Sequence, residues 1–412
     1  MKNRTEYYSH FPLTGALLLM LMLMLLLPSC MYEEGRTVEL NTRKLTTDLL
    51  DESAAAYEYE TIPLRTDRTA LVIIDLWEDE PVIDGLAECR VSPLLRLARE
   101  QGLTVVHAPS QNPDIHSSCM PDPGEIVVYG YQHIDRELAL RGIDTILFSG
   151  FDTFKCVLDK PMGIFQTLER NTSMRVIIIR DAVLSRKESW KRVATDMVER
   201  DIGRSTSLPD LYAAFGTAPP AKIYTDITVT GELTGYDSLG PGEYFSAENS
   251  ALVLSGTGAL EISPAGTFGT RASETIHEIQ QVLAEARSRH ITVIHVPGGF
   301  GNAASLSPLE GEPVIDNFES LIDIVEGNSI KVLFYAGFAA NRELLTGPAG
   351  LIRLYIRGRY GGKYIPRYIV LSDCTAAIET ADTIAEEISL EVSLSYRDTV
   401  TVTSDRFPDL FQ

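Results

Sequence analysis

Short, continuous apolar runs alternate along this chain with longer amphipathic stretches, in which apolar residues recur at three- and four-residue spacing. The runs at 69–75, 103–109 and 145–151 are typical of strands that are buried on both faces of a parallel sheet. The stretches at 92–102 and 274–290 are typical of amphipathic helices. Strands that alternate with helices form right-handed βαβ units. The pattern therefore predicts an α/β fold with a doubly wound, Rossmann-like parallel sheet between two layers of helices.

The whole pattern occurs twice, which predicts two tandem domains of the same α/β type. Residues 65–216 form the first predicted domain and residues 249–412 a degenerate second copy. The segment 217–248, rich in Gly, Pro, Ser and Thr, is the predicted linker. Segments that match between the copies are, in order, 69–75 with 250–256, 103–109 with 291–297, 145–151 with 332–338, 175–181 with 368–373, and 209–211 with 408–410.

Residues 1–30 have the pattern of a targeting signal: a basic start, an apolar run at 13–27, and then Pro28, Ser29 and Cys30. A run of about 15 residues is shorter than the roughly 20 that a spanning helix needs, which favours a cleaved signal peptide. Its end resembles the lipobox of bacterial lipoproteins. We expect a lipid anchor on Cys30, with simple secretion as the alternative, and a polar tether over 31–64. The resemblance implies an extracytoplasmic, membrane-anchored protein of the bacterial cell envelope.

Composition adds a few exclusions to this picture. The chain has 412 residues, 44% hydrophobic and 23% charged, which is ordinary for a globular protein. Its formal net charge of -21 argues against a nucleic-acid partner, because neutralising phosphates requires an excess of Lys and Arg. Five cysteines are too few for a disulfide scaffold. Cys89 and Cys119 could pair outside the cytoplasm, and Cys374 has no predicted role.

Candidate chemistry lies where strands end, because ligands of open α/β sheets bind outside the carboxyl ends of the strands, near the point where strand order reverses. Asp75 follows the first strand of copy one, and Cys156 follows the fourth. We expect Cys156 in the first turn of a helix, where free N–H groups and the helix dipole favour the thiolate. Asp75 could then exchange its proton. The alternative is structural: a small buried Cys and a turn-capping Asp.

Comparison of the two copies separates these interpretations. Copy two has Gly256 in place of Asp75 and Glu343 in place of Cys156, so the two candidate groups change together. This is expected if they act as a pair in one site only, which leaves the second domain catalytically inactive. Some polar residues are present in both copies, which indicates a structural role; they are His107 with His295 and Asp181 with Asp373.

Three segments of the first copy carry a family resemblance: residues 70–75 with Trp77, the stretch 102–110, and the element Gly-Phe-Asp-Thr-Phe-Lys-Cys-Val-Leu at 150–158. Together they resemble the isochorismatase-like cysteine hydrolase family. The resemblance spans about 65–216 and, in degenerate form, 249–412. It implies a doubly wound α/β sheet and hydrolysis of a small amide or a related small-molecule substrate, with no cofactor.

The same resemblance implies roles for individual residues. Cys156 would be the nucleophile and Asp75 the base. Turn amides near Phe151, Asp152 and Cys156 would form an oxyanion hole, and a non-proline cis peptide would fall between Phe151 and Asp152. Trp77 would either line the mouth of the pocket or pack against the fold.

One member of the family's triad has no counterpart where it is expected. That member is a Lys at the end of the third strand, and here Tyr129 or a near neighbour takes its place. Stabilisation of a thiolate would then depend on the helix amino terminus, or on Arg136 or His133. Two functions follow: a hydrolase that acts through Cys156, or a catalytically inactive binding or scaffold lipoprotein that keeps the fold.

Metal binding and assembly complete the expectations. Asp114 and His116, with His133, loosely resemble the metal site of nicotinamidases, a branch of the same family, but the second His follows the third strand instead of preceding it. We favour a polar loop and expect no metal. The second domain is expected to pack on the first as a partner subunit would, giving an intrachain pseudo-dimer that does not exclude a homo-oligomer.

Overall fold

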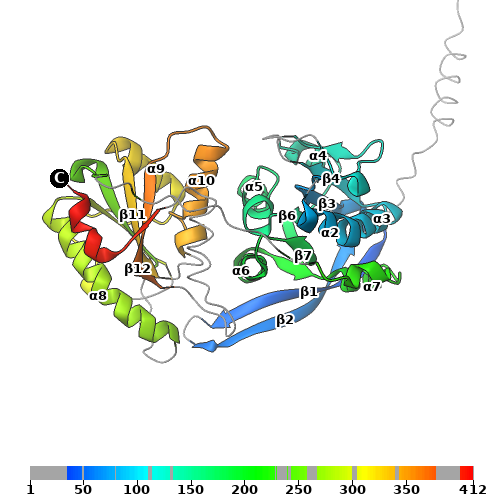
Figure 1. The fold of residues 1–412 in the computed structure, drawn as a ribbon, viewed down its shortest axis with the longest axis horizontal. Helices are drawn as coiled ribbons and strands as arrows, with labels where there is room; N and C mark the ends of the chain where they lie inside the picture. Colours follow the sequence, from blue (N-terminus) through cyan, green and yellow to red (C-terminus); the bar gives the residue numbers. More distant parts are fainter. Residues whose placement is uncertain are drawn as a thin grey trace, which may run out of the picture.

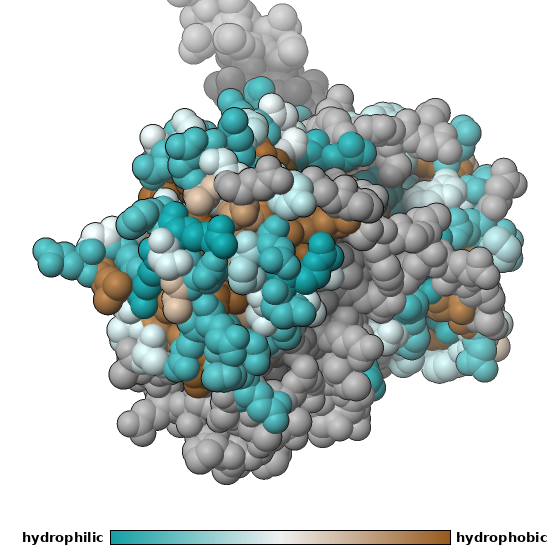
Figure 2. Space-filling view, turned by 60° about the vertical axis from the view of Figure 1, so that its left-hand side comes forward, coloured by the Kyte–Doolittle hydropathy of each residue, from teal (hydrophilic) through white to brown (hydrophobic). Residues whose placement is uncertain are grey.

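The structure is a computed structural model of the chain that describes residues 35–48, 51–78, 80–109, 114–129, 133–227, 229, 239, 243–257, 267–298, 304–338, 343–376 and 400–411. The predicted signal peptide and Cys30 lie outside these residues. The described chain forms two α/β units (Figure 1), and the face drawn in Figure 2 is largely hydrophilic where it is described. Within the described residues, no helix combines the length and the apolar character that crossing a bilayer requires.

The first sheet confirms the predicted α/β fold. Its parallel core follows the order β8-β7-β6-β3-β4-β5. Neighbouring residues of β3 point to opposite faces, because alternate side chains enter different apolar clusters and all are buried. The strands are β3 (Thr69–Ile74), β4 (Thr104–Ala108), β5 (Ile126–Val127), β6 (Thr145–Phe151), β7 (Arg175–Leu184) and β8 (Arg204–Thr206).

A long hairpin extends this sheet where the sequence analysis expects a tether. β1 (Thr37–Asp48) and β2 (Asp51–Arg65) pair antiparallel as a long hairpin (Figure 1). β1 joins the sheet beside β8. The hairpin also docks through side chains: Arg43 Nε donates to Glu199 Oε1 at 2.9 Å, and Tyr57 Oη to Asp196 Oδ1 at 2.9 Å. Residues 37–48 and 51–65 are therefore part of the folded unit and not a tether.

Helices cover both faces of the first sheet, as predicted. One face carries α2 (Pro81–Leu86), α3 (Ser92–Glu100) and α7 (Leu208–Ala214). The other carries α4 (Asp135–Leu140), α5 (Ile164–Arg170) and α6 (Glu188–Met197).

The second sheet has the same strand order as the core of the first. Its order β13-β12-β11-β9-β10 corresponds to β8-β7-β6-β3-β4. The strands are β9 (Ser250–Ser255), β10 (Thr292–Val296), β11 (Val332–Phe338), β12 (Arg367–Ala376) and β13 (Val400–Val402). One face is covered by α8 (Thr267–Ser288), the other by α9 (Phe318–Gly327) and α10 (Leu351–Arg359). We call the unit around each sheet a repeat.

Polar residues shared by the repeats perform the same structural task in each. A histidine on β4 and a histidine on β10 each bind a glutamate that also pairs with an arginine. The two sets are His107–Glu125–Arg99 and His295–Glu312–Arg287. Burial opposes ionisation of these glutamates, but hydrogen bonds from the Arg, a backbone amide and the His hold the pKa of both carboxyls at about 2. Asp181 and Asp373 likewise cap backbone N–H groups in both repeats. These duplicated contacts support the predicted structural role.

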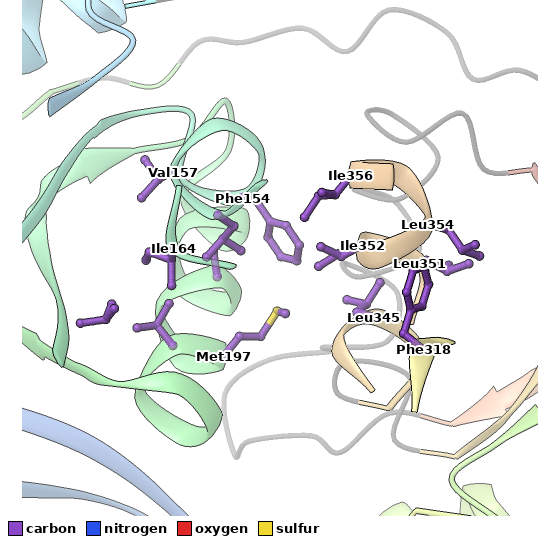
Figure 3. Packing of buried hydrophobic residues seen from close by; sticks show 14 of the residues in the cluster. Phe154, Val157, Ile164, Met197, Phe318, Leu345, Leu351, Ile352, Leu354 and Ile356 are labelled. Carbon is purple, nitrogen blue, oxygen red and sulfur yellow. The ribbon is translucent and has the colours of Figure 1, made fainter. Parts of the chain in front are cut away.

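The repeats share one apolar cluster. The face of α4, α5 and α6 in the first repeat and the face of α9 and α10 in the second contribute to it. Figure 3 shows Phe154 and Met197 of the first repeat pointing toward Ile352 and Ile356 of the second. All four side chains are buried, so this contact joins the two repeats by apolar packing.

Candidate active site

The sheet topology brings the ends of β3 and β6 together. From β3 the chain moves outward to β4 and β5, then returns to β6 beside β3 and continues to β7 and β8. Strand order therefore reverses between β3 and β6, where a crevice opens in doubly wound folds. Asp75 follows β3 directly, and the turn with Cys156 follows β6. Gly150 permits this approach: its φ is +125°, and a Cβ there would stand 1.9 Å from Ile74 O.

The turn after β6 has the geometry that the family resemblance implies. The peptide bond between Phe151 and Asp152 is cis, which confirms that prediction. Cys156 lies in a π-helical turn over Thr153–Val157, and its N–H donates to Asp152 O at 2.8 Å. The amide of Cys156 is thus used within the turn, and it is not a free oxyanion donor in this geometry.

Asp75 forms an ion pair that the sequence analysis does not predict. Its carboxylate is completely buried, its backbone has a φ of 50°, and Oδ1 accepts a hydrogen bond from Lys160 Nζ. Lys160 follows Cys156 by one turn, because its N–H donates to Cys156 O at 3.2 Å. Residues four apart share a helix face, so Lys160 and Cys156 are both placed toward Asp75. The structure thereby assembles a Cys, an Asp and a Lys at the end of β3.

The electrostatics of this group differ from the expected ones. Burial raises the pKa of the Cys156 thiol well above its ordinary value, and the Asp75 carboxylate raises it further, while the Lys160 ammonium lowers it. The direction is opposite to the lowered thiol pKa expected from a helix amino terminus. In the resting site the cysteine is a neutral thiol beside a carboxylate that can accept its proton.

The residues expected to replace the family's lysine do not do so. Tyr129 is 46% exposed, and both His133 and Arg136 are exposed. The cation comes instead from Lys160, on the carboxyl side of the cysteine. The four-residue spacing between Cys156 and Lys160 was a signal for it, because it places both on one face of a helical turn.

Aromatic side chains pack beside the cis peptide. The Trp77 and Phe151 rings meet edge-on with centroids 5.9 Å apart, and the Arg186 guanidinium lies 5.7 Å from the Phe151 centroid. Phe151 and Asp152 are buried, whereas Trp77 is partly exposed. The side chain of Phe151 therefore belongs to the core, and Trp77 is the member of this pair that solvent reaches.

The corresponding place in the second repeat is built differently. Gly256, Glu343 and Gly347 stand where the first repeat has Asp75, Cys156 and Lys160, in that order. The Glu343 side chain fills the space that these glycines leave: a Cβ on Gly256 would lie 3.5 Å from Glu343 Cγ, and one on Gly347 2.8 Å from Glu343 Oε2. The second repeat therefore lacks all three reactive groups at this position.

A separate cluster near the end of β3 has the composition of a cation site. Ligand atoms of Glu78, Asp84 and His116 all lie within 4.8 Å of one another. His116 Nε2 is 3.3 Å from Asp84 Oδ1 and 3.6 Å from Glu78 Oε2, and the imidazole is buried. Of the three residues that resemble the nicotinamidase site, only His116 takes part, since Asp114 and His133 are exposed. Among the residues that the structure describes, these three side chains could hold a metal.

The three other cysteines that the structure describes play no part in this site. Cys89, Cys119 and Cys374 are free thiols, and Cys119 Sγ donates to Ala87 O at 3.6 Å. Burial raises the pKa of Cys119 to about 11, as expected for a thiol that packs as an apolar group.

No family model and no curated protein matches the chain. Among solved structures, it is similar to a cysteine hydrolase from Pseudomonas syringae pv. phaseolicola 1448A, with 15% identity and a TM-score of 0.32 over 37% of this chain and 94% of the other. An isochorismatase family protein from Burkholderia thailandensis has 19% identity and a TM-score of 0.32 over 37% and 97%. N-carbamoylsarcosine amidase from Thermoplasma acidophilum has 20% identity and a TM-score of 0.28 over 34% and 95%. Each similarity covers about a third of this chain.

Proposed function

We propose that the first repeat is a cysteine hydrolase that cleaves a small amide or a related acyl compound, with Cys156 as nucleophile and Asp75 as base. The observation that carries the proposal is the buried Asp75–Lys160 ion pair beside the Cys156 thiol. Three neighbouring ionisable groups at a reversal of strand order are more than turn capping or packing requires.

The chemistry follows from the charges of these groups. Asp75 accepts the thiol proton while Cys156 Sγ bonds to the substrate carbonyl carbon, and the same proton passes to the leaving nitrogen as the C–N bond breaks. Water then gives a proton to Asp75 and attacks the thioester, which releases the acid and restores the thiol. Lys160 pairs with the Asp75 carboxylate and offsets the negative charge that develops in the buried site.

The same ion pair weighs against a purely binding or scaffold function for the first repeat. That alternative rests on the absence of a triad lysine, and Lys160 supplies an ammonium to the same carboxylate from another position. The second repeat, with Gly256, Glu343 and Gly347, has no nucleophile or cation there and is proposed to be catalytically inactive.

An activated ester tests the proposal without knowledge of the natural substrate. p-Nitrophenyl acetate should give a burst of p-nitrophenolate that is stoichiometric with protein, followed by steady turnover. Cys156→Ala should abolish both phases. Cys89→Ala, which removes a partly exposed thiol elsewhere, should keep them. Equal release by the wild-type and Cys156→Ala proteins would overturn the proposal.

We propose in addition that Cys30 is lipidated and holds the protein to the outside of a bacterial cell membrane. The support is the sequence of residues 13–30 alone. Metabolic labelling with an alkyne fatty acid should mark the wild-type protein in the membrane fraction, and Cys30→Ser should lose the label. A labelled Cys30→Ser protein would contradict this assignment.

A further inference from the structure

One face of α10 in the second repeat is turned toward the cysteine turn of the first. Ile352, Ile356 and Tyr360 recur at four-residue intervals, so they share a helix face, and Tyr360 N–H continues the last turn to Ile356 O at 2.9 Å. Figure 3 shows Ile352 and Ile356 pointing toward Phe154, which lies two residues before Cys156. Tyr360 and Cys156 both pack against the apolar cluster that the repeats share.

The corresponding site of the second repeat also borders the first repeat. A cavity of about 730 Å³ lies between the repeats at the place that corresponds to the Cys156 site, and Glu343 and Gly347 line it. Helices of both repeats line it: Phe165 and Leu168 come from α5 of the first repeat, and Ile352 and Ile356 come from α10 of the second. In sequence α5 corresponds to α10, because each helix follows a matching Pro-x-Gly turn. The two corresponding helices therefore border the same space between the repeats.

Tyr360 itself lies in the electrostatic field of the reactive groups. Its side chain is partly buried, and its ring meets that of Tyr355 edge-on at 6.0 Å. Burial raises the pKa of its phenol first, and the charges of Tyr355, Asp159, Cys156 and Asp75 raise it further. The hydroxyl consequently stays protonated at any working pH and is a hydrogen-bond donor.

We propose that Tyr360, carried by the inactive repeat, is a substrate-positioning residue of the Cys156 site. Its ring narrows the approach to the thiol, and its hydroxyl donates to a neutral acceptor such as a carbonyl oxygen on a small substrate. This inference rests on the proposed hydrolase function for the role of the hydroxyl. It names the class of substrate the site admits: small acyl compounds with a hydrogen-bond acceptor near the scissile bond.

Alkylation of Cys156 tests the ring without any turnover. Iodoacetamide is compact and N-ethylmaleimide is bulky, and both rates are measured on the intact folded chain from the mass of the tryptic peptide 156–170. Tyr360→Ala should raise the N-ethylmaleimide rate relative to the iodoacetamide rate by about 10-fold, whereas Tyr360→Phe should leave that ratio unchanged. The matched control is Tyr364→Ala, since Tyr364 is 62% exposed in the same segment and its loss should change neither rate. An unchanged ratio in Tyr360→Ala would overturn the inference.

The hydroxyl is tested with p-nitrophenyl acetate. Tyr360→Phe should raise KM by about 5-fold and leave kcat nearly unchanged, because it removes one hydrogen bond to bound substrate and keeps the ring. An unchanged KM would overturn the assignment of the hydroxyl. Failure of the hydrolase proposal is a different result, namely no Cys156-dependent turnover in the wild-type protein. In that case the ratio of the two alkylation rates still tests whether the Tyr360 ring restricts access to the thiol.

Discussion

Replacement of Asp75 by Asn should separate reactivity from catalysis at Cys156. The substitution removes the negative charge that raises the pKa of the thiol and leaves the Lys160 charge, which lowers it. The pKa of Cys156 should therefore fall, and the thiolate should form at a lower pH than in the wild-type protein. Hydrolysis should nevertheless be lost, because the amide cannot accept the thiol proton or return it to the leaving group.

The size of the effect follows from the interaction of neighbouring charges. A charge within hydrogen-bonding range of a buried group shifts its pKa by roughly 1–3 units, so the thiolate fraction near neutral pH should rise by about 10- to 1000-fold. The nucleophilicity of a thiolate falls as its pKa falls, with a Brønsted slope of about 0.5. Alkylation should therefore accelerate by only about 3- to 30-fold. Removal of a general base costs about 10²- to 10⁴-fold in turnover.

The assay is the rate of iodoacetamide labelling of peptide 156–170 between pH 6 and pH 10, beside turnover of p-nitrophenyl acetate. Lys160→Met should have the opposite effect on the alkylation rate, since loss of the ammonium should raise the pKa of Cys156 and slow its alkylation. Asp144→Asn is the matched control, because Asp144 pairs with Arg68 at the surface and directly precedes β6, at the end of the strand away from the site. Circular dichroism should establish that each variant is folded.

The two variants also define the result that would refute the reasoning. If Asp75 and Lys160 merely support the fold, both substitutions should loosen the turn and change alkylation in the same direction. Slower alkylation in Asp75→Asn, or equal rates in Asp75→Asn and Lys160→Met, would contradict the electrostatic account of the site.

Three further predictions concern the scaffold, each read from urea denaturation. Gly150→Ala should lower the free energy of unfolding by about 3 kcal/mol or more, because the added Cβ would stand 1.9 Å from a backbone oxygen of β3. The control Gly216→Ala, at positive φ in open space, should lower it by about 1 kcal/mol. Equal losses would contradict the close approach at Gly150. Ile356→Ala should cost about 2–4 kcal/mol and Leu140→Ala, which is 76% exposed, under about 0.5 kcal/mol; equal losses would contradict packing between the repeats. Glu125→Gln should lower the free energy of unfolding by about 1–2 kcal/mol above pH 4.5. This difference should vanish as the pH falls toward 2, because the carboxyl of the folded protein has a pKa of about 2 and becomes protonated there. A difference that does not change with pH would refute this account.

The sequence predicts the buried strands well because they carry apolar residues on both faces of the sheet, as β3 does throughout its length. Asp75 and Cys156 are also predicted, since the ends of neighbouring parallel strands must meet at one edge of the sheet. The hairpin of β1 and β2 escapes prediction because few of its side chains are buried: among them are Val38, Leu40 and Leu64, and polar residues separate them. Its position at the sheet edge, with β2 outermost, explains that weak signal.

Lys160 escapes prediction for another reason. A family pattern specifies the chain position of a residue, whereas the chemistry requires only that an ammonium reach the carboxylate. A lysine side chain is long and flexible, so several chain positions around one carboxylate can deliver the same charge. The pKa of Cys156 could not be predicted from its place in a helical turn either, because burial and Asp75 outweigh the local backbone.

The shared apolar cluster gives the second repeat, which we propose to be inactive, a physical role in the first. Phe154 and Val157 flank Cys156 on its turn, and both are buried in the cluster that the second repeat completes with Ile352 and Ile356. Without α10, these side chains would lose part of their packing, and the turn that positions the thiol would lose support. Loss of the packing face of α10 should therefore damage the site. Substitutions in the second repeat should accordingly alter the reactivity of Cys156 when they fall on the face of α10, and not when they fall in the glycine-lined space around Glu343.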